Sequence, residues 1–260
     1  MNVKDEAFPS VPQALLLVVA LFVAEMVVGM VLYDFKGGLG LSQNATSALV
    51  VLFGNGLLIS TILHAKDMSY RSLLHPTSSS VLATLALTVL PLAVLTPALV
   101  LVNGTIIDWL VQQVPLSQWE EASFSRMSDG TLPSVVAVCL LAPVVEEMLF
   151  RGIILRAFLH RYPRGLAMAW SAMVFGVAHL NLYQFLVATC LGLILAWLYE
   201  RTRSLYPCVA LHVIYNCMVT LFGMEDLSDS VGLWVVALAL AAAGGLGLRA
   251  TLGRKAVQAC

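Results

Sequence analysis

Eight apolar stretches, each close to the length that crosses a bilayer, constrain this chain more than any other feature. A spanning helix needs about 20 apolar residues, and such stretches lie at about 12–33, 46–65, 81–103, 132–156, 164–180, 182–200, 205–223 and 231–250. Only 11% of the residues are charged, whereas a soluble domain carries about 25%. The sequence therefore predicts an all-α, polytopic membrane protein of about eight transmembrane helices, organised as one integral-membrane domain over residues 1–260.

The segment from residue 105 to residue 131 differs from these stretches. Ile106, Ile107 and Leu110 follow helical spacing, with polar side chains on the opposite side, and Trp109 and Trp119 are of the type that settles at a membrane–water boundary. We predict one amphipathic helix lying on the membrane surface. A plain loop is the alternative.

The distribution of basic residues predicts the orientation. With a cytoplasmic N-terminus, two basic residues fall in outer loops, Lys36 and Arg126, and eleven fall on the cytoplasmic side: Lys4, Lys66, Arg71, Arg156, Arg161, Arg164, Arg201, Arg203, Arg249, Arg254 and Lys255. Cytoplasmic loops carry such an excess of Lys and Arg, so we expect both termini in the cytoplasm. The excess of arginine over lysine favours a prokaryotic plasma membrane. Because the basic residues are scattered, nucleic acid is not an expected partner.

Three charged residues interrupt the fourth apolar stretch, namely Glu146, Glu147 and Arg151. A charge at the bilayer centre costs at least about 2.5–3.5 kcal/mol on insertion scales, so its presence suggests a functional site. Glu147 and Arg151 are i,i+4 neighbours on a helix and are expected to pair. Glu146 lies about 100° around the helix and remains free to act as general base toward a water. The alternative is a structural bridge, with Glu146 bonded to a neighbouring helix.

Two further polar patterns lie in later apolar stretches. Phe175-Gly176-Val177-Ala178-His179 ends the fifth stretch, where Gly176 permits close helix approach and a short uncharged turn predicts a tight hairpin. His212 and Asn216 share one helix face and could donate to a developing oxyanion. Read alone, His179 could be structural, and His212 with Asn216 could simply join helices. From the helix lengths, we expect the site between the midplane and the cytoplasmic face.

Two polar residues in the first two helices carry less weight. Glu25 is expected to bond to a neighbouring helix, or else to line a substrate cavity, and Asn55 is expected to join helices. Pro91 and Pro97 should kink the third helix.

Together the three patterns resemble the motifs of the CPBP family of intramembrane proteases, which includes CaaX prenyl endopeptidases and bacteriocin-processing enzymes and is also called the Abi family. The order and spacing match over about residues 143–216, inside a motif-bearing core of 132–223. The resemblance implies that Glu146 and His179 activate the hydrolytic water and that His212 and Asn216 stabilise the oxyanion. It also implies supporting positions, which are Glu147, Arg151 and Phe175.

The expected function is therefore an intramembrane endopeptidase that cleaves a membrane-associated protein or a lipidated chain end. Its expected partners are that peptide or protein substrate and the lipid bilayer, and no cofactor is expected. Zinc is the alternative, held by Glu146, His179 and His212 in a site of two histidines and one carboxylate, although no HExxH spacing is present. The competing functions are a non-catalytic immunity or maturation factor and a proton-coupled transporter. The transporter would predict duplicated halves with broken helices, which the sequence does not show.

Overall fold

A computed structural model describes residues 8–35, 37–127, 129–222 and 230–257, and all regular structure within them is helical. The chain order is α2 (Val11–Phe35), α3 (Gln43–Ala65), α4 (Tyr70–Leu74), α5 (Val81–Gln113), α6 (Gln118–Met127), α7 (Leu132–Val136), η1 (Ala137–Leu141), α8 (Ala142–Glu147), η2 (Met148–Leu155), α9 (Arg156–Arg161), α10 (Arg164–Val177), α11 (Leu182–Thr202), α12 (Leu205–Phe222) and α13 (Val231–Val257).

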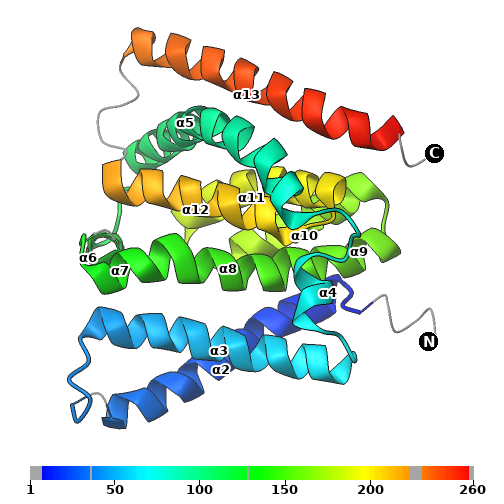
Figure 1. Ribbon diagram of the computed structural model, residues 1–260. Coiled ribbons are helices and arrows are strands. Elements are labelled where there is room, and N and C mark those ends of the chain that lie inside the picture. The colour runs from blue at the N-terminus through cyan, green and yellow to red at the C-terminus, as the bar shows by residue number, and fades with distance from the viewer. Residues whose placement is uncertain (1–7, 36, 128, 223–229, 258–260) are drawn as a thin grey trace.

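The helices stack in layers (Figure 1). At one side α13 packs on α5, and at the opposite side α2 pairs with α3. Between them lie α10, α11 and α12 together with the continuous run from α7 to α9. The helices that carry the three motifs are therefore the central ones.

Six of the described helical segments are long and apolar enough to cross a membrane: Val11–Phe35, Gln43–Ala65, Val81–Gln113, Leu132–Arg161, Leu182–Thr202 and Val231–Leu252. Two shorter apolar helices, Arg164–Val177 and Leu205–Leu221, complete the set. These eight correspond to the eight predicted stretches, and the protein is an all-α polytopic membrane protein.

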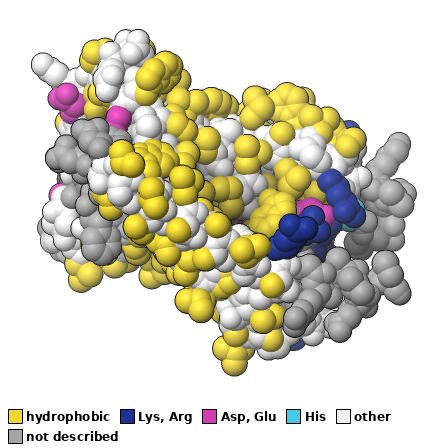
Figure 2. All heavy atoms as spheres, turned by 90° about the horizontal axis from the view of Figure 1, so that it is seen from above, with side chains coloured by type: hydrophobic (Ala, Val, Ile, Leu, Met, Phe, Trp, Pro, Cys, Tyr) yellow, Lys and Arg dark blue, Asp and Glu magenta, His cyan; other side chains and the backbone are white. Residues whose placement is uncertain are grey.

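The surface separates into an apolar body and two polar ends. Figure 2 shows hydrophobic side chains across most of the face, with Lys and Arg gathered around an acidic side chain at one end and further acidic side chains at the other. The start of α2 and the end of α13 lie at the same end of the bundle (Figure 1), as the charge pattern requires. The side chains of Lys4, Lys36, Arg254 and Lys255 lie outside the described residues.

The segment from 105 to 131 departs from the predicted single surface helix. α5 continues without a break to Gln113, and Leu110 is buried within it. The helix ends where Pro115 follows, because a residue before proline is driven out of the helical region, and Val114 is extended (φ −131°, ψ 95°). A separate helix, α6, then begins after Ser117, whose backbone N–H and hydroxyl both donate to Glu120 Oε2 (2.9 and 2.7 Å).

The central run is irregular, and α10 is short. Two π-helical segments, η1 and η2, flank α8, and such wide turns often occur at functional sites. α10 has 14 residues, so at 1.5 Å per residue it rises only about 21 Å. A Cβ at Gly176 would overlap the Thr189 hydroxyl and lie 2.8 Å from the Phe185 carbonyl oxygen, which confirms the close helix approach predicted there.

Candidate active site

The predicted pair of Glu147 and Arg151 is present and fully enclosed. Arg151 Nη1 lies 2.8 Å from Glu147 Oε1, and both side chains are 0% exposed. Arg151 Nη2 also donates to the Gly192 carbonyl on α11 (3.2 Å). An uncompensated buried charge is expensive, so a guanidinium shared between a carboxylate and a carbonyl fixes the two helices together.

His212, on α12, connects this pair to Glu146. Its Nδ1 lies 2.9 Å from Glu147 Oε1, and because a carboxylate bound to Arg151 can only accept, Nδ1 carries the hydrogen. Nε2 then faces Glu146 Oε2 at 3.7 Å, which is too long for a direct hydrogen bond. The Glu146 side chain remains 24% exposed. The two adjacent acids therefore differ: Glu147 is fully buried and its Oε1 accepts from both Arg151 and His212, whereas Glu146 is partly exposed.

The Phe175 ring, on α10, organises the other side chains. Arg151 Cζ lies 4.4 Å from its centroid in a cation–π contact. The rings of His179 and His212 both meet it edge-on, with centroids 5.0 and 5.8 Å away. One buried aromatic ring thus fixes the positions of both imidazoles, a role that the spacing of its motif did not reveal.

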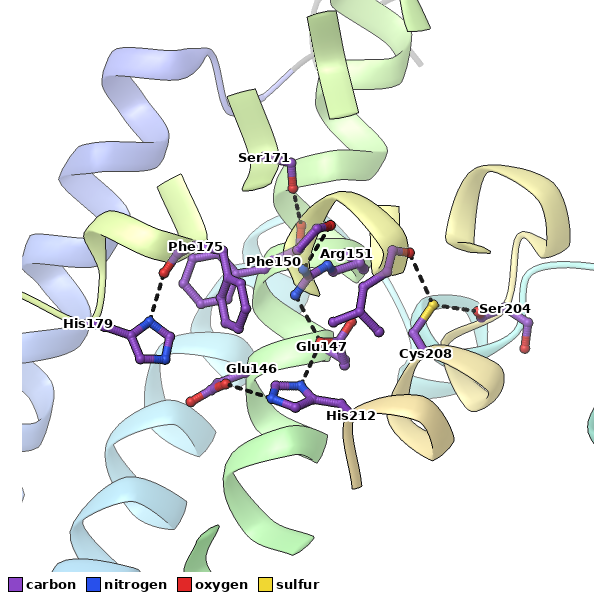
Figure 3. A network of polar contacts seen from close by, with 12 residues as sticks. Glu146, Glu147, Phe150, Arg151, Ser171, Phe175, His179, Ser204, Cys208 and His212 are labelled. Carbon is purple, nitrogen blue, oxygen red and sulfur yellow. Dashed lines mark hydrogen bonds and ion pairs between the residues drawn. The ribbon is translucent and has the colours of Figure 1, made fainter. Parts of the chain in front are cut away.

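His179 lies in the turn that follows α10. Its Nδ1 donates to the Phe175 carbonyl (2.9 Å), since a carbonyl can only accept, and Nε2 is left with a lone pair. In the view of Figure 3 the Glu146 carboxylate stands between the two imidazole rings. Glu146 and His212 therefore face each other beside the buried Glu147–Arg151 pair, and His179 contacts the same Phe175 ring as His212.

Asn216 is bound elsewhere, one turn beyond His212 on α12. Its Nδ2 donates to the Val138 carbonyl in η1 (2.8 Å). That carbonyl has lost its helical donors: Ala142 N–H turns to Ala137 instead, and the next residue, Pro143, has no N–H. Asn216 thus satisfies a backbone group that Pro143 leaves without a partner. Nδ2 carries a second hydrogen, which stays available.

Glu25, on α2, is a third carboxylate within the apolar helices, and the sequence analysis gave it less weight than Glu146 and Glu147. Asn55 Nδ2, on α3, donates to Glu25 Oε1 (2.9 Å), so the predicted bond to a neighbouring helix is confirmed. A Cβ at Gly54 would lie 3.0 Å from the Glu25 Cα, so α2 and α3 make their close approach here. α3, whose Asn55 holds Glu25, packs on α8, which carries Glu146. Gly54, next to Asn55, was the sequence signal from which this close approach of α2 and α3 could have been predicted.

The turn behind His179 is anchored outside the membrane-spanning helices. Asn181 Oδ1 accepts from the N–H groups of Tyr183 and Gln184 at the start of α11, and its Nδ2 donates to Glu120 Oε1 on α6 (2.8 Å). The Ser117 hydroxyl and N–H hold the pKa of Glu120 below its ordinary value. The carboxylate of α6 therefore secures the turn two residues after His179.

The residues named for the alternative zinc site are Glu146, His179 and His212. Within the part of the chain that the structure describes, no three His, Cys, Asp or Glu side chains are grouped to hold one metal ion. His212 presents Nδ1 to Glu147, so Nε2 is the ring nitrogen that could bind a metal.

Two comparisons with known proteins found matches, one of them to the segment that carries the motifs. Residues 128–218 match the family model described as Type II CAAX prenyl endopeptidase Rce1-like. A 95-residue alignment with the Bacillus subtilis (strain 168) protein named "Putative membrane peptidase YdiL" is 29% identical and covers 36% of this chain and 39% of that relative. The fold is that of a multi-pass membrane protein. The segment 128–218, which contains all three motifs, is similar to the Rce1-like peptidases.

Proposed function

We propose that this chain is an intramembrane endopeptidase that hydrolyses a peptide bond of a membrane-associated protein or a lipidated chain end. The observation that carries the proposal is the contrast between the two acids: Glu147 is 0% exposed and paired with Arg151, whereas Glu146 is 24% exposed beside His212. A reachable carboxylate next to a fixed ion pair suits a general base. The family match of residues 128–218 supports the same reaction class.

In the proposed reaction Glu146 takes a proton from a water that also donates to His179 Nε2. The resulting hydroxide attacks the scissile carbonyl carbon, and a tetrahedral intermediate forms with negative charge on its oxygen. Collapse of the intermediate breaks the C–N bond, and Glu146 returns its proton to the leaving amine. His179 can accept from the water because its Nδ1–H is already directed to Phe175.

The proposed oxyanion donors are His212 and Asn216. His212 can hold the oxyanion only when both ring nitrogens carry hydrogen, because Nδ1–H already points to Glu147. It then offers Nε2–H from the side that faces Glu146. Asn216 would contribute its second Nδ2 hydrogen, with the first retained by Val138. Glu147, Arg151 and Phe175 would maintain this geometry without touching the substrate.

No cofactor takes part in the proposed mechanism, and the chain is proposed to act in a prokaryotic plasma membrane with both termini cytoplasmic. Incubation with a zinc chelator should leave the rate of cleavage unchanged. Loss of cleavage on chelation, with recovery at about one zinc per chain, would replace this mechanism with a metal-dependent one.

The decisive test begins with substrate discovery. Membrane proteins of cells that carry the wild-type chain are compared with those of cells that carry Glu146→Gln, and fragments found only with wild type identify the substrates. A peptide that spans the cleavage site is then cut by the purified protein. We expect Glu146→Gln to lower the rate by about 10²–10⁴-fold with an unchanged unfolding temperature.

Two controls separate mechanism from folding. Glu121→Gln, in α6, removes an exposed carboxylate that is not part of the motifs and should cleave like wild type. Glu147→Gln should lower the unfolding temperature. Full activity in Glu146→Gln would overturn the mechanism, and the absence of any fragment specific to wild type would favour the non-catalytic alternative.

A further inference from the structure

A cavity of about 550 Å³ lies apart from the catalytic side chains, at the end of the bundle where basic residues gather. Its lining comes from α4, the loop that follows it, the start of α5 and the start of α12. The side chains that matter for binding are Arg71, His75, Thr77, Ser78 and Tyr206. This volume falls in the range of small-ligand sites, about 300–1,000 Å³.

The wall of the cavity is ordered by His75. Its Nε2 donates to the Ser79 carbonyl (2.6 Å) and its Nδ1 accepts from the Ser204 hydroxyl (2.9 Å). The Thr77 hydroxyl contacts both His75 Nε2 and the Ser79 hydroxyl (3.1 and 2.8 Å). The loop is thereby tied to the residues that precede α12, so the cavity is formed before any ligand arrives.

The charge of the cavity is positive and unopposed. Arg71 lines it with an exposed side chain, and among the described residues its guanidinium forms no ion pair or side-chain hydrogen bond. No Asp or Glu belongs to the lining. A guanidinium presents a planar set of N–H donors that matches phosphate oxygens.

The start of α5 adds to this charge. Ser80 caps the helix by accepting from Ala83 N–H (3.4 Å), and the first-turn N–H groups have no acceptor within the helix. Val81, at that first turn, lines the cavity. A 33-residue helix directs the positive end of its dipole here. Arginine, serine and threonine hydroxyls and free N–H groups form a set of donors for an anion.

The level of the cavity in the membrane indicates which kind of anion it binds. α5 is a membrane-spanning helix whose first turn forms part of the cavity, so the cavity lies where one face of the bilayer ends. Tyr206, beside it, is of the type found at that boundary. Basic pockets between helices at this level bind anionic lipid headgroups. We propose that this cavity binds the phosphate group of an anionic membrane lipid, with Arg71 as its principal ligand.

The site is mechanically joined to the catalytic run. Leu73, on α4, packs so closely on η2 that a Cβ at Gly152 would lie 2.7 Å from its Cδ1. Arg156 Nη1 donates to the Ser72 carbonyl (3.0 Å). A lipid held by Arg71 would therefore stabilise α4 against the helix that carries Glu146.

The test uses the full chain in lipid nanodiscs of phosphatidylcholine, with or without phosphatidylglycerol, and measures bound lipid by native mass spectrometry and the unfolding temperature. We expect phosphatidylglycerol to be retained and to raise the unfolding temperature of wild type. Arg71→Gln should weaken retention about tenfold, as expected for the loss of one charge-assisted bond. Ser78→Glu, at an exposed position, should do the same by adding a negative charge to the cavity.

The matched control is Arg249→Gln, because Arg249 is an exposed arginine of α13 that does not line the cavity. It should retain the lipid like wild type. An equal loss in this variant would show general charge attraction and overturn the site, as would full retention in both Arg71→Gln and Ser78→Glu. Equal stabilisation by inorganic phosphate in phosphatidylcholine nanodiscs would keep the phosphate site but assign it a soluble ligand. If Arg71→Gln retains the lipid like wild type but alters the cleavage of a peptide with a free C-terminal carboxylate, the cavity binds substrate and the proposal is overturned.

Discussion

The central helices and the outer helices are both apolar, yet they bury very different shares of their surface. In α2 only 11% of the apolar window is buried and in α13 17%, whereas in α11 it is 44%. The outer helices expose Leu and Val side chains, and the centre encloses Arg151, Glu147 and His212. Hydropathy alone cannot separate the two regions, because in a membrane both the lipid and the protein interior are apolar. Only the spacing of the few polar residues distinguishes them.

The largest effect should follow from removing the buried cation. Arg151→Ala leaves the carboxylate of Glu147 without its partner, and breaking such a pair costs about 3–5 kcal/mol of unfolding free energy. The comparison is Arg201→Ala, whose side chain is 51% exposed and whose loss should cost less than about 0.5 kcal/mol. Reversible unfolding in mixed micelles measures both, and similar values would show that the central pair is not structural.

Two glycines should respond in opposite directions to the same added methyl group. Gly176→Ala forces a Cβ against the Phe185 carbonyl, and overpacking of this kind costs about 1–3 kcal/mol. At Gly245, on α13, a Cβ meets no atom within 4 Å, so Gly245→Ala should be neutral or stabilising by up to about 1 kcal/mol. The same unfolding assay applies. A loss of stability at Gly245 would indicate that α13 is packed more tightly than its exposed side chains suggest.

A double-mutant cycle can isolate the bond between Asn216 and Val138. Asn216→Ala leaves the Val138 carbonyl without a donor, and a buried unpaired group costs about 1–3 kcal/mol. Pro143→Ala restores a backbone N–H, so in that background Asn216→Ala should cost about 1 kcal/mol less. Strictly additive unfolding free energies would show that Pro143 is not the reason for this bond.

The smallest effect is expected on the outer face of α2. Leu16 is 66% exposed, and Leu16→Ala should change the unfolding free energy by less than about 0.5 kcal/mol. Leu21, on the same helix but buried, is the control and should be clearly more sensitive to the same change. Equal sensitivity would mean that the face around Leu16 is covered by protein in the membrane.

The sequence predicted the helices and the division between Glu146 and Glu147 because both follow from periodicity. Apolar runs report spans directly, and i,i+4 spacing alone was enough to assign Arg151 to Glu147. It missed the end of α5, although Pro115 marked that end, because the polar side chains after residue 105 resembled the start of a new helix.

The remaining features depend on contacts between distant segments, which spacing does not encode. The Phe175 ring, on α10, contacts His212 on α12 as well as His179, and the spacing within either motif does not indicate a contact between the two helices. Asn216 donates to the Val138 carbonyl because a wide turn in η1 leaves that carbonyl without a helical donor. The local sequence around Pro143 does not indicate which carbonyl is left unpaired.

The shortness of α10 has a consequence for the surrounding bilayer. It rises about 21 Å, against a hydrocarbon thickness of about 30 Å, and it still exposes Leu166, Met173 and Val177 at its surface. Lipids beside this face are mismatched in length with the helix they touch, and a bilayer responds to a short partner by thinning. The turn at the end of α10, which carries His179, should therefore lie beside a thinned bilayer, and short-chain lipids should accommodate this side of the protein with the least distortion.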